Sequence, residues 1–112
     1  MDVTVERQDS VLVARVSGRI DPRGAGSLET TITAALQDGD HAVILDFEQL
    51  AYIGNVGVRA LRITARVLRD RDVRIAVCAP QGVVAAVFSG GGVDRLISVY
   101  QTRAAALAAL SD

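Results

Sequence analysis

An unbroken apolar run at residues 42–45, set between Asp40 and Asp46, constrains the fold more than any other segment. A strand whose residues are all apolar is typical of a sheet that is covered on both faces. After Gly57 the period of the apolar residues changes to the spacing of one helical stripe, carried by Val58, Leu61, Ala65 and Leu68. The segment therefore predicts a buried strand, a short turn and a helix with one buried face.

Strands and helices are predicted to alternate along the rest of the chain. A hairpin is expected from strands at 3–5 and 11–16, joined across 7–10. Helices are expected at 22–37, 56–68, 81–89 and 102–110, and further strands at 73–78 and 96–99. This order predicts an α/β fold, with a mixed sheet of about five strands, about four helices and right-handed crossovers between parallel strands. In the first helix the expected inner residues are Ala25, Leu28, Ile32, Ala35 and Leu36.

The length and the apolar content indicate one soluble domain. A chain of 112 residues is long enough for a single core, so we expect one domain over residues 1–112. Half of the residues are apolar, yet no apolar run approaches the roughly 18 residues of a membrane span. The N-terminus lacks the basic and apolar regions of a signal peptide. We therefore expect a cytoplasmic protein with no direct membrane insertion.

Charge and cysteine content argue against several classes of function. A formal net charge of -1 gives no general electrostatic reason to bind nucleic acid. The single cysteine, Cys78, excludes an internal disulfide and a Cys-rich zinc site. No metal-ligand spacing or Ser/His/Asp arrangement stands out, so we expect no metal, no cofactor and no catalytic site. An enzyme built on Cys78 and His41 is a remote alternative, because a core thiol and an edge imidazole are the simpler interpretation.

Four segments, in order, carry a resemblance to a known family. The turn after the central strand reads Gly54-Asn55-Val56-Gly57-Val58, and residues 11–21 form a strand that ends in Gly-Arg-Ile-Asp. Together with the strand at 73–79 and the helix exit at 88–93, these segments resemble the STAS domain. That fold is shared by bacterial anti-sigma factor antagonists and the cytoplasmic tails of sulphate transporters. The resemblance covers nearly the whole chain and implies a STAS-like fold.

The resemblance also implies partner switching. In antagonists the turn typically reads Asp-Ser-Ser-Gly-Leu, and the first Ser is phosphorylated by the anti-sigma kinase. Asn55 stands at that position and has no hydroxyl; Val56 has none either, and Tyr52 lies outside the matching position. The resemblance therefore implies an antagonist that captures an anti-sigma factor or an anti-sigma serine kinase. It also implies that phosphorylation at the usual position does not end this capture. Control would come from synthesis, competing partners or modification elsewhere.

The resemblance places the partner surface on this turn, on the helix that follows and on an Asp after the second strand. The residues so assigned are Asp21, Gly54, Asn55, Val56, Arg59, Arg62 and Arg66. Asn55 and Asp21 are also good helix caps, and both interpretations stay open. The arginines, continued by Arg69, share one helical face. That pattern is typical either of a solvated face or of an Arg-rich docking surface for carboxylates.

Other interpretations remain open within the same fold. A protein without the phosphorylatable Ser could be a scaffold relative, as in stressosome assemblies, or an accessory subunit of a lipid-transport ATPase. The sequence does not decide whether the chain is a homodimer. Gly90-Gly91-Gly92 follows a helix instead of preceding one and lacks the Lys of a phosphate-binding loop, so we expect a left-handed helix exit there.

Overall fold

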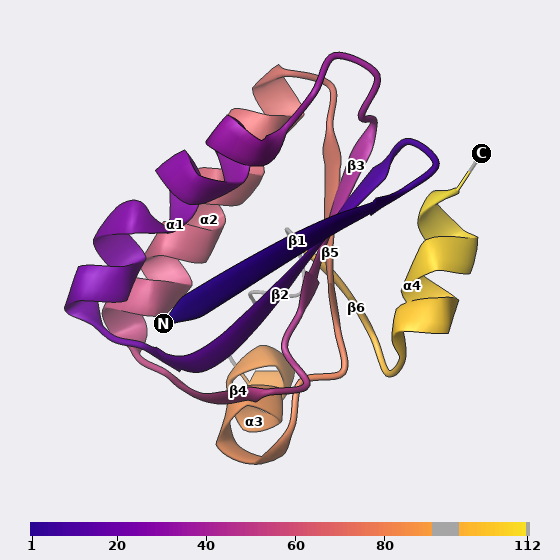
Figure 1. The fold of residues 1–112 in the computed structure, drawn as a ribbon. Coiled ribbons are helices and arrows are strands. Elements are labelled where there is room, and N and C mark those ends of the chain that lie inside the picture. The colour runs from indigo at the N-terminus through magenta and orange to yellow at the C-terminus, as the bar shows by residue number, and fades with distance from the viewer. Residues whose placement is uncertain (91–96, 112) are drawn as a thin grey trace.

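The chain alternates strands and helices in the computed structural model, which describes residues 1–90 and 97–111 (Figure 1). The strands are β1 (Asp2–Gln8), β2 (Val11–Ile20), β3 (Ala42–Asp46), β4 (Leu50–Ile53), β5 (Arg74–Cys78) and β6 (Ser98–Tyr100). The helices are α1 (Pro22–Ala35), α2 (Asn55–Asp70), α3 (Gly82–Gly90) and α4 (Arg103–Leu110).

The sheet is mixed, as the alternation of elements predicts. Its strand order is β1-β2-β3-β5-β6, with β4 paired to the end of β2. Only the β1–β2 hairpin is antiparallel among the described pairs, and the other pairs are parallel. β3 lies at the centre and all five of its residues are buried, which confirms the prediction from the apolar run.

Helices cover both faces of the sheet. Figure 1 shows α1 and α2 side by side on one face, α4 on the opposite face, and α3 beside β4. The larger core lies under α1 and α2 and includes Leu28, Ile32, Leu61 and Leu68. The smaller core lies under α4, where Ala106 and Leu110 pack on Ile44 and Ala76. Among the helices of the described residues, none combines the length and the apolar character that crossing a bilayer requires.

Several predicted boundaries and burials differ from the structure. α1 ends at Ala35 because Leu36 has extended backbone, and Leu36 is only half-buried against the core. Val58 is likewise only partly buried. The strand β4 was not predicted, because its two exposed residues lie between two buried ones and give no alternation of period two. The glycines Gly91 and Gly92 of the expected helix exit, and the expected strand start at Leu96, lie outside the described residues.

The parallel pairing of β2 and β4 brings the starts of two helices together. α1 follows the carboxyl end of β2, and α2 follows the carboxyl end of β4. Ile20 is paired with Ile53 in the ladder between these strands. Both helices therefore begin at the same edge of the sheet, which is where four of the predicted site residues, Asp21, Gly54, Asn55 and Val56, lie.

Candidate functional site

Four of the predicted site residues, Asp21, Gly54, Asn55 and Val56, meet around one shallow depression, whereas Arg59, Arg62 and Arg66 lie outside its lining. It has a volume of about 320 Å³ and lies at the N-terminal end of α2; we call it the N-terminal depression. Its lining includes Asp21, Tyr52, Gly54, Asn55 and Val56. Asn55 is exposed and Val56 keeps 50% of its surface exposed, so this corner of the molecule is open to a partner. The structure thus brings together residues that are 31 to 35 positions apart in the sequence.

Gly57 allows α2 to start so close to the strands. A Cβ on Gly57 would lie 2.7 Å from Cγ1 of Ile53 and 2.9 Å from Cγ2 of Ile20. A Cβ on Gly54 would lie 2.9 Å from the hydroxyl oxygen of Tyr52. Gly57 therefore occupies a position in the first turn of α2 where a Cβ has no room, whereas at Gly54 the exposed end of the Tyr52 side chain could move aside.

Asn55 is not the cap of α2, and that prediction is wrong. Gly54 is the N-cap, with φ -96° and ψ -175°, and no side-chain hydrogen bond caps the helix. Asn55 is already inside the first turn, so its side chain has passed the position from which a cap reaches the next free amides. Asn55 is exposed, and its side-chain amide makes no capping hydrogen bond to α2.

Asp21 does cap its helix. Its Oδ1 accepts a hydrogen bond from the backbone amide of Gly24 at 2.9 Å, and Pro22 occupies the first helical position. The hydrogen bond from Gly24 lowers the pKa of the Asp21 carboxyl below its usual value. Asp21 therefore presents a carboxylate at the edge of the depression while it stabilises the start of α1.

Sequence reasoning missed a stacked pair beside Asn55. The guanidinium carbon of Arg19 lies 4.2 Å from the ring centre of Tyr52, a cation–π contact. Both residues line the N-terminal depression, and Tyr52 is 38% exposed. Because β4 was not predicted, the sequence gave no reason to place Tyr52 next to the end of β2.

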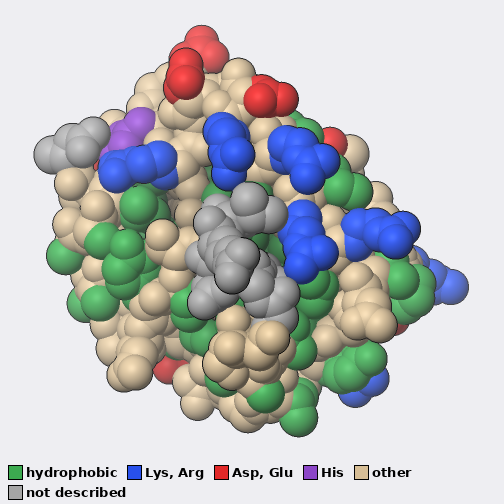
Figure 2. All heavy atoms as spheres, turned by 180° about the vertical axis from the view of Figure 1, so that it is seen from behind, with side chains coloured by type: hydrophobic (Ala, Val, Ile, Leu, Met, Phe, Trp, Pro, Cys, Tyr) green, Lys and Arg blue, Asp and Glu red, His purple; other side chains and the backbone are tan. Residues whose placement is uncertain are grey.

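The arginines of α2 form a continuous basic surface. Arg59, Arg62, Arg66 and Arg69 are all exposed, and their spacing places them on one side of the helix. Figure 2 shows Arg side chains gathered over the upper part of the face seen from behind. We call these four residues the Arg face. It begins one turn after Asn55, so it is continuous with the depression.

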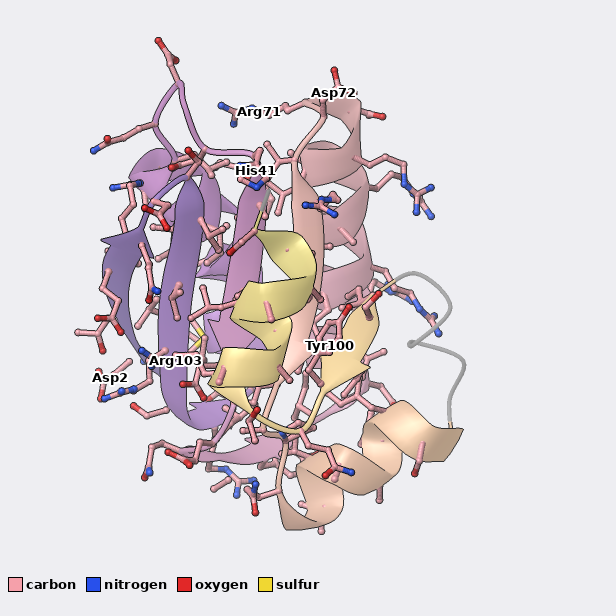
Figure 3. The ribbon with its side chains drawn as sticks, turned by 90° about the vertical axis from the view of Figure 1, so that its right-hand side faces the viewer. Asp2, His41, Arg71, Asp72, Tyr100 and Arg103 are labelled. Atoms are coloured by element: carbon pink, nitrogen blue, oxygen red, sulfur yellow. The ribbon has the colours of Figure 1, made fainter. Side chains whose placement is uncertain are left out.

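Sequence reasoning also did not predict a charged network at the start of α4, on the face of the sheet opposite α1 and α2 (Figure 1). Asp46, at the end of β3, is 4% exposed and accepts hydrogen bonds from Nη2 and Nε of Arg103, at 2.8 and 3.2 Å. Arg103 also donates to Glu6 on β1, and Figure 3 shows it at the start of α4. The hydrogen bond to Asp46 raises the pKa of Arg103. The pairing compensates a buried carboxylate and fastens α4 to the sheet.

His41 and Cys78 do not form a catalytic pair. The β3–β5 register pairs Ala42 with Arg74 and Asp46 with Cys78, so the two residues lie near opposite ends of the strands, separated by about 16 Å of strand length. His41 Nε2 donates to the carbonyl of Leu110 at 2.8 Å. Burial raises the pKa of the Cys78 thiol to about 11, which keeps it protonated. The prediction of a core thiol and an edge imidazole is confirmed.

In the described part of the chain, no three His, Cys, Asp or Glu side chains come together in a way that could hold a metal ion.

Comparison with known proteins decides the family. The model of the STAS domain matches residues 2–106. The chain belongs to the STAS domain family. Among curated relatives of this STAS domain, BtrV of Bordetella bronchiseptica is 30% identical over 109 residues, which cover 97% of this chain and 94% of BtrV. The anti-sigma-F factor antagonist RsfB of Mycobacterium tuberculosis is 27% identical over 100 residues, covering 89% of this chain and 81% of RsfB.

Solved structures agree with the fold of this STAS domain. The crystal structure of an anti-sigma factor antagonist from Mycobacterium paratuberculosis superposes with a TM-score of 0.83 at 30% identity. It covers 99% of this chain and 94% of its own. The protein is therefore an anti-sigma factor antagonist-like STAS domain, and the resemblance seen in its motifs is confirmed.

Proposed function

We propose that this STAS domain captures an anti-sigma factor, of the serine-kinase type, through the N-terminal depression and the Arg face. The observation that carries the proposal is the meeting of Asp21, Gly54, Asn55 and Val56 around one exposed depression at the start of α2. RsfB and the mycobacterial structure are antagonists of anti-sigma factors by name, which supports this class of partner.

The chemistry of the surface supports protein binding over catalysis. The depression combines apolar groups, such as Val56 and the Tyr52 ring, with the Asp21 carboxylate and the Asn55 amide at its edge. Interfaces of this kind typically use an aromatic or apolar centre with polar groups around it. The Arg face adds guanidinium groups that hold carboxylates in bidentate pairs, so we expect acidic residues on the partner.

The proposal includes that the capture is not ended by phosphorylation at the usual position. A phosphate adds about -1.5 to -2 charge at neutral pH and needs a hydroxyl to attach to. Asn55 offers an amide there, and Val56 an aliphatic group. The protein would thus stay competent to bind and would be controlled by its synthesis, by competing partners or by modification elsewhere.

Affinity capture from the native cytosol, with mass-spectrometric identification of what is retained, tests the class of partner. Recovery of an anti-sigma kinase supports the proposal, whereas recovery of stressosome scaffold proteins or of a lipid-transport ATPase replaces it with the corresponding alternative. Recovery of none of these contradicts it.

Charge reversal along α2 tests the surface. In the captured complex, Arg59→Glu and Arg66→Glu are expected to weaken binding at least about tenfold, because each turns an attraction to a carboxylate into a repulsion. Arg71→Glu is the matched control, since Arg71 is an exposed arginine at the C-terminal end of the same helix and outside the Arg face. Equal losses in all three variants would show that the surface is misplaced.

A further inference from the structure

A second concave site lies at the other end of α2. It is a cavity of about 470 Å³ between the C-terminal part of α2, the start of β5, the edge strand β6 and the end of α4; we call it the C-terminal cavity. Its volume falls within the roughly 300–1,000 Å³ of small-molecule sites. Arg69 lines this cavity, and its 14-residue separation from Asn55 corresponds to about 21 Å along the helix. The cavity is therefore separate from the N-terminal depression.

Polar groups from three elements line this cavity. Arg69 comes from α2, Arg74 from β5, and Ser98 and Tyr100 from β6. Figure 3 shows Tyr100 beside α4 and Asp72 toward the end of the sheet where His41 lies. Two guanidinium groups and two hydroxyl groups are all hydrogen-bond donors, and guanidinium groups bind carboxylates in a planar, two-point geometry. The cavity is equipped to hold an anionic oxygen pair.

Arg74 is held in place by the fold. Its Nη2 donates to the carbonyl of Leu110 at 2.7 Å, and the same carbonyl accepts from Nε2 of His41 at 2.8 Å. These bonds connect the end of α4 to the start of β5 and to the residue before β3. A guanidinium that is anchored in this way loses less conformational entropy when it binds a ligand than a mobile one does. Arg69, by contrast, makes no hydrogen bond or ion pair through its guanidinium in the described residues.

Apart from Asp72, the rest of the described lining is apolar, and it favours an organic anion over an inorganic one. Val73, Ile75 and Leu110 form a wall beside the arginines. An inorganic ion would leave this wall in water, whereas an organic group would cover it. Asp72 contributes one carboxylate to the described lining and partly offsets the charge of the two arginines, so this lining favours a single negative charge over the nearly double charge of a phosphate ester.

We propose that the C-terminal cavity binds a small organic carboxylate, with its carboxylate on Arg69 and Arg74 and its apolar body against Val73, Ile75 and Leu110. Hydroxyl donors from Ser98 and Tyr100 complete the site. Arg69 belongs to the Arg face as well, but the C-terminal cavity and the N-terminal depression share no lining residue, and binding of a small carboxylate is measured without the partner.

Titration of the ¹⁵N-labelled chain with phenylacetate, followed by NMR, tests the proposal. Saturable shifts are expected at the amides of Arg74, Ser98 and Tyr100. Arg69→Ala is expected to weaken binding about tenfold, because it removes charge-assisted hydrogen bonds. Arg59→Ala is the matched control on the same helix and outside the cavity, and it is expected to keep the wild-type affinity.

Three further probes separate the parts of the proposal. Each of the three probes is expected to bind more weakly than phenylacetate. Phenylacetamide is neutral, inorganic phosphate has no apolar body, and phenyl phosphate carries more negative charge. The proposal is overturned if phenylacetate gives no saturable shifts or if Arg69→Ala binds it as tightly as the wild type. Equal or tighter binding of any of the three probes also overturns it.

Discussion

The two ends of helix α2 are built on different principles. At the N-terminal end, Gly57 lets the helix approach β2 and β4 so closely that its position has no room for a methyl group. At the C-terminal end, Arg69, Asp70, Arg71 and Asp72 are all exposed, and the end of the helix lines a cavity together with β5, β6 and α4. One end is fixed by packing and the other is dominated by charge.

This difference between the two ends of α2 predicts whether a substitution changes the stability of the protein or its binding. At the N-terminal end a buried change should alter stability, while a change at exposed Asn55 should alter only what binds there. At the C-terminal end the exposed arginines make few packing contacts, so their substitution should leave the free energy of unfolding unchanged. The predictions below are ordered by the size of the expected effect.

The largest effect is expected for Asn55→Glu, measured as the affinity for the captured partner. A carboxylate at this open corner would be desolvated without a counter-charge in the complex, and we expect a loss of about 100-fold. The helix itself should tolerate the change, because a negative charge suits the N-terminal end of a helix. Gln8→Glu, an equal charge change on exposed β1, is the control and should bind normally. A loss in both variants would contradict the assigned surface.

The next effect concerns stability at the packed end. Gly57→Ala is expected to lower the free energy of unfolding by ~2 kcal/mol, because the new methyl would overlap Ile53 and Ile20. Gly26→Ala is its matched control in α1, where no atom lies within 4 Å of the new Cβ, and it should stabilise the protein by up to ~1 kcal/mol through helix propensity. Urea denaturation measures both. Similar values for the two variants would mean that the close approach of α2 is not rigid.

A smaller effect is expected at the cap that borders the depression. Because the pKa of Asp21 is lowered in the folded state, its carboxylate stabilises the protein above the pKa of the unfolded chain, about 3.9. This contribution is lost as the pH falls through the lowered folded value. Asp21→Asn keeps a cap without the titration, so its stability should depend less on pH between neutrality and that range. An unchanged pH profile of unfolding would argue against the carboxylate cap.

The smallest effect is expected at the charged end. Arg69→Ala should leave the melting temperature unchanged, because Arg69 is exposed and its guanidinium has no partner in the described residues. Arg103→Ala provides the contrast, since it removes the two hydrogen bonds that Arg103 donates to the buried Asp46 carboxylate, leaves that carboxylate only the backbone amide of Glu48, and should lower the melting temperature clearly. If thermal denaturation shows the same change in melting temperature for both variants, Arg69 and Arg103 do not differ in their contribution to stability, and this prediction is wrong.

Much of the fold could be predicted because its signals are local. The apolar run of β3 and the stripe Leu61, Ala65 and Leu68 were read from period alone and are buried as expected. The cap at Asp21 followed from ordinary capping chemistry and is confirmed. These features depend on residues within one or two turns of each other, which is the range that a sequence pattern covers.

The parts that escaped prediction depend on contacts between distant segments. The cation–π pair of Arg19 and Tyr52 exists only because β4 adds to the end of β2. The Asp46–Arg103 pair joins residues that are 57 positions apart. Asn55 has the right chemistry for a cap and lies one residue too late, because Gly54 takes the extended backbone of the capping position. The boundary of a helix is set by such details of packing, which periodicity does not resolve.

The central claim is that Asn55 makes the partner surface a binding site without a phosphorylation switch, and a mass measurement tests it most directly. The wild type and Asn55→Ser are each mixed with the captured kinase and ATP, and intact mass and complex stability are followed together. The account predicts that the wild type gains no phosphate on the turn and keeps its complex, while Asn55→Ser gains one phosphate and releases its partner. Stoichiometric phosphate on residues 52–58 of the wild type, with loss of the complex, would contradict it.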